Sequence, residues 1–132
     1  MTSYPGADII ITMWTIDRTE EILEWIARLD DDAKEAIYKN LLILKDIGPS
    51  LGRPYVDSVK DTKHKNMKEL RVQNKRRLFR IFFIFDPGRK AILLVGGDKR
   101  GDKRFYQRLV PVADQLYEEY LDKKEKKNGP KK

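Results

Sequence analysis

The side chains of this chain that could do chemistry are arginines, lysines and a tyrosine in and after its middle section. Arg71 and Arg80 lie in apolar segments with strand character, and Lys99, Arg100 and Tyr106 follow the next such segment. One guanidinium group can donate two parallel hydrogen bonds to the oxygens of a phosphate. Cations also stabilise the crowded phosphorane that forms when RNA is cut by its own 2′-OH. These residue types therefore predict phosphodiester chemistry without a metal ion.

Such a cleavage also needs a base for the 2′-OH proton and an acid for the leaving oxygen. Tyr106 is preceded by Lys103 and Arg104 and followed by Arg108, and this positive charge is expected to lower the pKa of its phenol. The alternative for Tyr106 is stacking on a base or a place on a helix surface. His64 is the only histidine, which excludes a two-histidine ribonuclease scheme.

Composition excludes several other kinds of active site. The chain has no cysteine, so a disulfide, a thiolate metal site and a cysteine nucleophile are all excluded. Asp86, Asp98 and Asp102 are scattered among lysines and arginines and do not form the carboxylate cluster of a two-metal nuclease. The sequence has neither a glycine-rich phosphate loop nor a nucleophile elbow. We expect no metal ion and no other cofactor.

Positive charge is concentrated in the middle of the chain. The net charge is +7, but residues 60–108 contain 16 Lys or Arg and only five Asp or Glu, whereas residues 1–59 are acidic. A basic surface on a rigid sheet favours a polyanion, most simply nucleic acid, as the partner. The alternative is that these are ordinary solvent-facing residues, paired with carboxylates such as Glu69. The basic residues at 75–77 lie in a turn and are expected to be solvated.

Length and hydropathy indicate one soluble domain. A chain of 132 residues with 40% hydrophobic side chains can bury a single core. No run approaches the roughly 20 apolar residues of a membrane span, and the N-terminus lacks a signal-peptide pattern. We therefore expect a cytoplasmic protein without a membrane partner. The domain is expected to cover residues 1–122, followed by a basic, disordered tail at 123–132.

The N-terminal half has the pattern of one strand and two helices. Residues 8–14 are rich in β-branched side chains and predict a strand. Capping-box patterns at 17–20 and 32–35 each precede apolar residues at helical spacing, and Gly48-Pro49 ends the second helix. Because few residues separate the helices, we expect an antiparallel helical hairpin, followed by a loop over residues 49–65.

Three strands and a last helix follow. Residues 66–73, 78–86 and 90–97 have strand patterns separated by turn residues, which predicts an antiparallel meander. Residues 103–122 have a helical pattern, with a kink or break expected near Pro111. The predicted fold class is α+β, with an N-terminal helical hairpin and a C-terminal helix packed on a small, mostly antiparallel sheet.

Strand alternation predicts which side chains share a face. In residues 78–86 the odd positions are apolar and form the expected core face, so Arg80 lies on the other face. The same rule applied to residues 66–73 places Glu69 and Arg71 on that other face. We expect this face to be open and basic. The residues expected at its edge are Lys99, Arg100, Lys103 and Tyr106.

Several short motifs occur in an order that resembles a known family. They are Leu51-Gly-Arg-Pro54, Asn66-Met-Lys-Glu-Leu-Arg71, Phe79-Arg80 and Gly97-Asp-Lys-Arg100, followed by Tyr106. Over residues 20–121 this series resembles the RelE/HigB-like toxins of type II toxin–antitoxin modules, and among them the phage-derived HigB-like branch. The resemblance implies a RelE-like fold and a small basic ribonuclease that cuts mRNA in the ribosomal A site and needs no metal.

The resemblance also implies a role for each matching side chain. Arg80 matches the strand arginine that contacts the scissile phosphate, and Arg71 matches a strand arginine on the same basic face of the sheet. Arg100, or its neighbour Lys99, matches the basic residue after the last strand. Tyr106 matches the C-terminal tyrosine that acts in acid–base catalysis or stacks on a base.

The general base departs from the family pattern. The RelE branch has lysines where this chain has Met67 and Glu69, and a lysine there is its favoured base. Here Glu69, Lys65 or His64 would have to take this role. The residues expected to bind the RNA strand around the catalytic set are Arg71, Lys65, Lys68, Lys103 and Arg104.

The resemblance also implies partners. Such toxins act on mRNA, often at the ribosome, and are neutralised by an antitoxin, which in the HigA-like branch is often a helix-turn-helix protein. The acidic helical half is a candidate surface for the antitoxin or for a homodimer. Two other functions stay open: a ParE-like toxin that inhibits gyrase, and a non-catalytic RNA-binding regulator.

Overall fold

The computed structural model describes residues 14–128 and contains a five-stranded sheet with helices on both faces. Strand order is β1-β5-β4-β3-β2, and all neighbours are antiparallel except β1 and β5, which are parallel. The elements are β1 (Thr15–Arg18), α2 (Glu20–Ala27), α3 (Asp31–Ile47), a 3-10 turn (Gly48–Ser50), β2 (Val56–Ser58), β3 (Met67–Asn74), β4 (Arg77–Asp86), β5 (Lys90–Asp98) and α4 (Phe105–Asn128).

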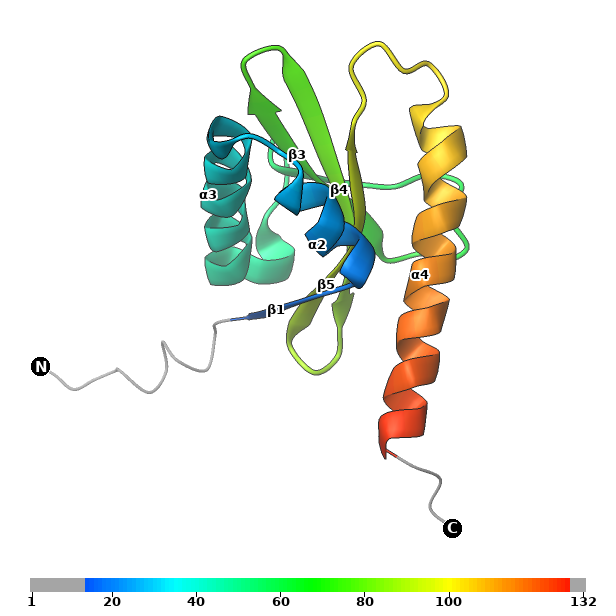
Figure 1. The fold of residues 1–132 in the computed structure, drawn as a ribbon. Helices are drawn as coiled ribbons and strands as arrows, with labels where there is room; N and C mark the ends of the chain where they lie inside the picture. The colour runs from blue at the N-terminus through cyan, green and yellow to red at the C-terminus, as the bar shows by residue number, and fades with distance from the viewer. Residues whose placement is uncertain (1–13, 129–132) are drawn as a thin grey trace, which may run out of the picture.

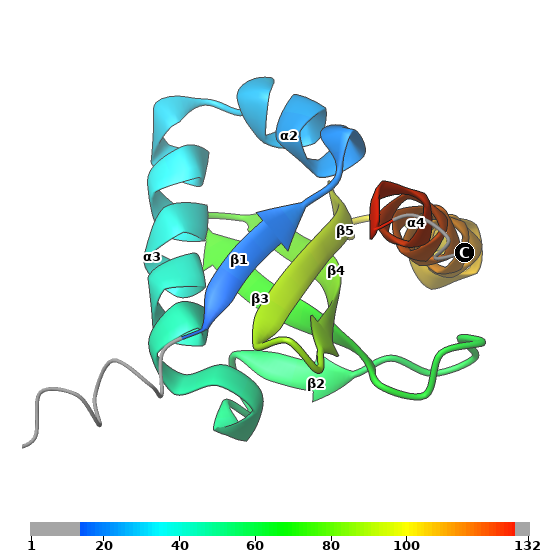
Figure 2. The ribbon, with the colours of Figure 1, turned by 90° about the horizontal axis from the view of Figure 1, so that it is seen from below.

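Helices α2 and α3 cover one face of the sheet and α4 covers the other (Figures 1 and 2). On the first face, Phe79, Ile81 and Phe83 pack against the buried side chains of α2 and α3. On the second face, Phe82 and Ile84 pack against α4. The expectation of an open second face was therefore wrong. A strand that is covered on both sides is apolar at nearly every position, as β4 is.

The α+β class and the meander of β3, β4 and β5 are confirmed, whereas the antiparallel helical hairpin is not. Helix α2 packs mainly on β5, and α3 packs mainly on β3, two strands further across the sheet. Figure 2 shows α2 lying across one end of α3 and not alongside it. Each helix therefore buries its apolar side against the sheet and not mainly against the other helix.

The helix starts differ from the expected capping boxes. The N-cap of α2 is Thr19, whose hydroxyl accepts a hydrogen bond from the Ile22 N–H at 3.2 Å. The N-cap of α3 is Asp30, whose carboxylate accepts from the Ala33 N–H at 2.9 Å. Asp17 is not a cap because it lies within β1, which pairs with β5. The strand expected at residues 8–14 falls outside the described residues except for Trp14, which precedes β1.

The expected loop at 49–65 contains β2, a three-residue strand that pairs with Leu70, Glu69 and Lys68 of β3. Helix α4 continues through Pro111 without a break, because Leu109, Val110 and Ala113 on either side of it are buried against the sheet. The helix also runs on to Asn128, within the segment 123–132 that was expected to be a disordered tail. None of the helices described here is both long and apolar enough to cross a membrane.

Candidate active site

The carboxylate of Glu69 lies at the centre of a polar cluster on the α4 side of the sheet. Arg71 Nε donates to Glu69 Oε2 at 3.0 Å, and the Tyr106 hydroxyl donates to Glu69 Oε1 at 2.7 Å. Arg80 Nε lies 3.8 Å from the same Oε1 atom. We call these four residues the Glu69 cluster. Because Glu69 is only 3% exposed, its partners hold the carboxylate in one orientation.

The pairing of β3 with β4 brings these residues together. Arg71 lies directly opposite Arg80, and Glu69 lies opposite Phe82, so all three polar side chains face α4. Gly97 on β5 lies opposite Arg80 on the other side. A Cβ on Gly97 would come within 3.0 Å of the Phe105 ring, so the absence of a side chain lets the first turn of α4 dock here. That docking places Tyr106 over Glu69.

Arg80 has donor capacity that the described residues do not use. It is 9% exposed, and its NH1 donates to the Phe79 carbonyl at 3.0 Å. Its buried Nε has no hydrogen-bond partner within residues 14–128. Because buried polar groups are nearly always satisfied, a guanidinium that is only partly hydrogen-bonded is suited to an anionic ligand.

Strand β2 adds the carboxylate of Asp57, which the sequence pattern did not indicate as a site residue. Asp57 Oδ2 accepts from Arg71 NH2 at 3.1 Å and from Arg53 Nε at 3.2 Å. The Ser58 backbone N–H, followed by Arg53 and Arg71, holds the pKa of the Asp57 carboxyl below its usual range. Arg71 is therefore fixed between Glu69 and Asp57. The only local signal was a short Val56–Ser58 stretch in a segment rich in proline, glycine and aspartate.

Two surface hollows meet at Arg71. The first, the Glu69 hollow, has a volume of about 410 Å³ and is lined by Arg53, Asp57, Ser58, Val59, Lys60, Asp61, Glu69, Arg71 and Tyr106. The second, the Tyr55 hollow, has a volume of about 440 Å³ and is lined by Asn40, Pro54, Tyr55, Arg71, Gln73, Leu78 and Arg80. Arg71 therefore borders open space in both hollows.

The pKa of Tyr106 is shifted in the direction opposite to the expected one. Burial raises it first, and the hydrogen bond to Glu69 and the Glu69 charge raise it further. The Arg80 charge and hydrogen bonding oppose this rise without overcoming it. The phenol therefore stays protonated at neutral pH, which suits a proton donor and not a base.

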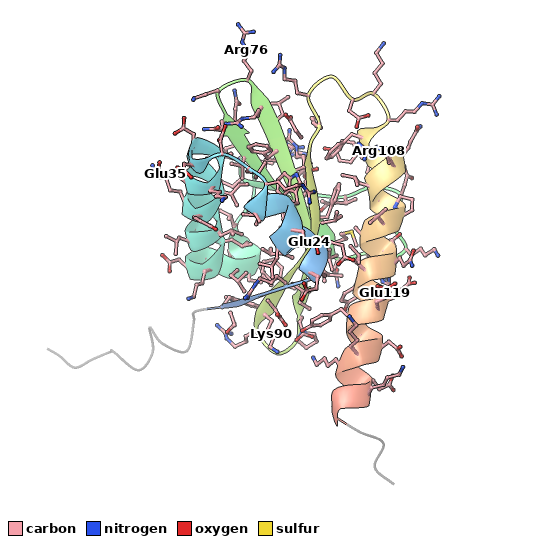
Figure 3. All side chains as sticks on the ribbon, viewed as in Figure 1. Glu24, Glu35, Arg76, Lys90, Arg108 and Glu119 are labelled. Carbon is pink, nitrogen blue, oxygen red and sulfur yellow. The ribbon has the colours of Figure 1, made fainter. Side chains whose placement is uncertain are left out.

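The remaining basic residues divide into those near the cluster and those away from it. The Lys99 ammonium lies 5.5 Å from the centre of the Tyr106 ring. Arg100, Lys103 and Arg104 are exposed in the segment between β5 and the first turn of α4. Figure 3 shows Arg76 and Arg108 toward this same end of the molecule, with Lys90 at the opposite end.

The structure does not bring His64, Lys65 or Lys68 into the Glu69 cluster. His64 Nε2 lies 3.1 Å from Glu118 Oε2, and its ring packs edge-on against Tyr117, both on the middle of α4. Lys65 is exposed in the loop before β3. Lys68 alternates to the opposite face from Glu69 and reaches toward Ser58 at 3.5 Å.

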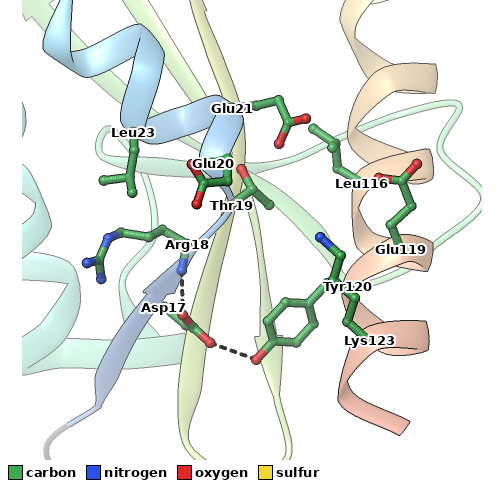
Figure 4. A pocket seen from close by; sticks show the side chains of 10 residues that line it. All are labelled: Asp17, Arg18, Thr19, Glu20, Glu21, Leu23, Leu116, Glu119, Tyr120 and Lys123. Carbon is green, nitrogen blue, oxygen red and sulfur yellow. Dashed lines mark hydrogen bonds between the residues drawn. The ribbon is translucent and has the colours of Figure 1, made fainter. Parts of the chain in front are cut away.

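A third hollow, shown in Figure 4, lies between β1, the start of α2 and α4. The Tyr120 hydroxyl donates to Asp17 Oδ2 there at 2.8 Å, and three glutamates also line it, Glu20, Glu21 and Glu119. This density of carboxylates disfavours an RNA phosphate. Within residues 14–128, no group of three or more His, Asp or Glu side chains is arranged to hold a metal ion.

Comparison with known proteins gives the chain a family relationship. A family model described as Phage derived protein Gp49-like matches residues 24–118. Two candidate toxins of Mycobacterium tuberculosis are similar in sequence. HigB3 is 45% identical over 102 residues, which cover 76% of this chain and 88% of HigB3. HigB2 is 40% identical over 125 residues, which cover 90% of this chain and 62% of the length of HigB2.

The fold also has a relative among solved structures. A mutant of the Escherichia coli toxin RelE in the free state superposes with a TM-score of 0.52 at 11% sequence identity. The match covers 70% of this chain and 90% of the RelE chain. At this identity the similarity supports a RelE-like arrangement of the sheet and helices.

Proposed function

This chain belongs to the Gp49-like family of phage-derived proteins, and from that membership we propose that it is the toxin of a type II toxin–antitoxin system, an endoribonuclease that cuts mRNA. The observation that carries the proposal is the Glu69 cluster, because it brings a candidate base, two guanidinium groups and a protonated phenol together beside the two hollows that meet at Arg71. The similarity to the two HigB proteins and the RelE-like fold supports the same class.

In this proposal Glu69 takes the proton of the 2′-OH, and the resulting alkoxide attacks the adjacent phosphorus. Arg71 and Arg80 bind the non-bridging oxygens and stabilise the phosphorane as its charge develops. The P–O5′ bond then breaks while Tyr106 donates its proton to the leaving oxygen. The products are a 2′,3′-cyclic phosphate and a 5′-hydroxyl end. The raised pKa of Tyr106 supports its assignment as the acid.

The hydrogen bond between Tyr106 and Glu69 supplies a route for resetting the site. After cleavage Glu69 carries the proton from the 2′-OH, and Tyr106 has lost one to the 5′-oxygen. These two oxygens lie 2.7 Å apart in the free chain, so the proton can pass directly from the carboxylic acid to the phenolate. No outside acid or base is then needed between turnovers.

We propose that the reaction is independent of metal ions, because Arg71 and Arg80 supply the positive charge at the phosphate that a metal would otherwise provide. Arg100 and Lys99 are assigned to the flanking RNA backbone, together with Lys103 and Arg104. We assign His64, Lys65 and Lys68 no part in the chemistry, because they lie outside the Glu69 cluster.

The proposed partners are mRNA, the ribosome and a cognate antitoxin, which we expect to be a helix-turn-helix protein. The site of action is then the cytoplasm. A ParE-like gyrase inhibitor and a non-catalytic RNA-binding regulator are not favoured, because both M. tuberculosis relatives are HigB toxins by name and the Glu69 cluster has the composition of a phosphodiester-cleaving site. A homodimer has no specific support.

Induction of the toxin in bacteria tests the proposal. We expect growth arrest accompanied by in-frame cuts in mRNA, and loss of both in Glu69→Gln and Arg80→Ala. The matched controls are Glu35→Gln, on the outside of α3, and Arg76→Ala, in the turn between β3 and β4. Arrest that survives Glu69→Gln would overturn the nuclease assignment. Gyrase-dependent DNA breaks with intact mRNA would instead support the ParE-like alternative.

A further inference from the structure

We propose that the Tyr55 hollow binds the base next to the scissile phosphate and that Asn40 and Gln73 there select a base with an exocyclic amino group. This inference rests on the proposed function, because it describes the same RNA site in more detail. Arg71 and Arg80, assigned above to the phosphate, line this hollow together with Tyr55, Asn40 and Gln73. A nucleotide whose phosphate lies against the two arginines therefore has its base in the same hollow as the other three side chains.

Tyr55 provides a surface on which a base can stack. It lies immediately before β2 and is 40% exposed. Its backbone carbonyl accepts a hydrogen bond from the Arg71 N–H at 2.7 Å, so the residue is tied to the strand that carries the phosphate-binding arginine. Exposed aromatic rings in a groove that also holds basic side chains are a common platform for single-stranded RNA bases.

Asn40 offers an acceptor to the edge of that base. Its Nδ2 donates to the Ala36 carbonyl at 2.9 Å, and because a carbonyl can only accept, the amide cannot be turned the other way. Its Oδ1 atom is therefore the group that is left for a ligand. Gln73, exposed on β3, adds a second amide with both a donor and an acceptor. Adenine, cytosine and guanine carry an amino group that such acceptors bind, and uracil does not.

The state of Arg80 supports a ligand in this position. Its guanidinium is nine-tenths buried and lines the Tyr55 hollow, and within the described part of the chain NH1 donates one hydrogen bond, to the Phe79 carbonyl. A group of this kind is expected where a ligand completes the hydrogen bonds. A nucleotide bound in this hollow would accept hydrogen bonds from the remaining N–H groups of Arg80.

The base beside each cut can be measured in a cell-free translation reaction, which supplies ribosomes, with a defined mRNA and mapping of 5′ ends. The double variant Asn40→Ala, Gln73→Ala tests base selection. Its ratio of cuts beside amino-bearing bases to cuts beside uridine should fall about 5-fold or more. Tyr55→Leu should lower total cutting about 5-fold or more, because the stacking surface is lost.

Tyr55→Phe keeps the stacking ring and should therefore cut faster than Tyr55→Leu. The matched control is Tyr38→Leu, which removes another exposed tyrosine, on α3 outside the hollow, and should change neither rate nor preference. Thermal unfolding followed by circular dichroism checks the fold of each variant. If Tyr55→Leu does not fold, the double variant Asn40→Ala, Gln73→Ala alone tests the base-binding subsite.

The outcomes distinguish a failure of the proposed base-binding subsite from a failure of the proposed nuclease function. A wild type that cuts in a Glu69-dependent way, with a base preference that the amide double variant leaves intact, would overturn the subsite and leave the nuclease standing. A wild type that prefers uridine would also overturn the subsite. A wild type that makes no more cuts than Glu69→Gln would overturn the proposed function and the subsite with it.

Discussion

At the scale of single residues, the contact between Tyr106 and Glu69 joins the proposed acid to the proposed base. Tyr106→Phe removes the hydroxyl and keeps the ring against Phe82. We expect the cleavage rate to fall about 100-fold or more, because a positioned general acid contributes roughly 10²–10⁴-fold. Single-turnover cleavage of mRNA in a translation extract measures this.

The control for this substitution is Tyr117→Phe, which removes a phenol on the same helix beside His64. Phenylalanine retains the ability to stack on a base, so the comparison also separates an acid from a stacking surface. Equal rates for the two variants would show that the Tyr106 hydroxyl takes no part in proton transfer.

The pKa of Tyr106 gives a second prediction. An acid must be protonated to act, and burial together with Glu69 raises this pKa above its usual value of about 10. Loss of the acid on the alkaline side therefore begins at a higher pH than for an ordinary tyrosine. We expect no fall in the cleavage rate between about pH 7 and pH 9, measured with wild-type protein. A decline with a midpoint within that interval would contradict the assignment.

The sequence was sufficient to predict that Glu69, Arg71 and Arg80 share a face, because strand alternation alone requires it. It was not sufficient to predict how they interact. The pKa of Tyr106 depends on burial against Phe82 and on Glu69, which lies 37 residues away in the chain. The flanking lysines and arginines suggested that the pKa would be lowered. Their side chains are exposed to water, which screens their charge, so they have little effect on the phenol.

At the scale of elements, a buried carboxylate holds the loop between β2 and β3 against α4. Asp114 is 4% exposed and accepts hydrogen bonds from the Thr62 hydroxyl and from the Lys63 N–H, the latter at 3.0 Å. This loop contains Lys60 and Asp61, which line the Glu69 hollow. Asp114 therefore connects the middle of α4 with the rim of the proposed active site.

Asp114→Ala is expected to destabilise the protein by about 1–3 kcal/mol, because it leaves the donors of Thr62 and Lys63 without their acceptor. Urea unfolding measures this, and hydrogen exchange should show faster exchange in residues 60–66. The control is Gln115→Ala, at the exposed neighbouring position of the helix. Indistinguishable unfolding of the two variants would mean that the loop is held by other contacts.

The elements that were predicted correctly are those with strong local patterns. Strands β3, β4 and β5 follow one another through tight turns, so their pairing can be inferred from neighbouring residues. Strand β2 has only three residues and is stabilised by the edge of β3, so nothing local distinguishes it from a loop. The covering of the second face by α4 had a signal in Phe82 and Ile84, which are too apolar for a solvent-facing side.

At the scale of the whole molecule, the acidic N-terminal half neutralises part of the basic middle. Lys75 pairs with Asp32 at 2.5 Å, and Arg77 pairs with Asp30 at 2.9 Å, so the turn between β3 and β4 is tied to the start of α3. The segment between β5 and α4 is different. The side chains of Arg100, Lys103 and Arg104 are exposed there, close in sequence to Tyr106. Three exposed positive charges therefore lie on the segment that leads into Tyr106.

If these three exposed residues bind the RNA backbone, their replacement by alanine should weaken binding to all sequences alike. Each phosphate contact that is lost reduces the slope of log affinity against log salt by about 0.7 for a single strand. Loss of three contacts should therefore reduce the slope by about 2, from an expected value of about −3 to −4 in the wild type. Fluorescence anisotropy with an uncleavable 2′-O-methyl RNA, at several salt concentrations, measures both values.

A second triple variant removes the same charge from other places: Lys34 and Lys39 on α3 and Lys123 near the far end of α4. Because long-range attraction depends on total charge, both triple variants should bind more slowly at low salt. Only the variant with changes at Arg100, Lys103 and Arg104 should lose about half to two thirds of the slope, because a phosphate contact releases counterions and a distant charge does not. Equal slopes in the two variants would place the RNA elsewhere on the molecule.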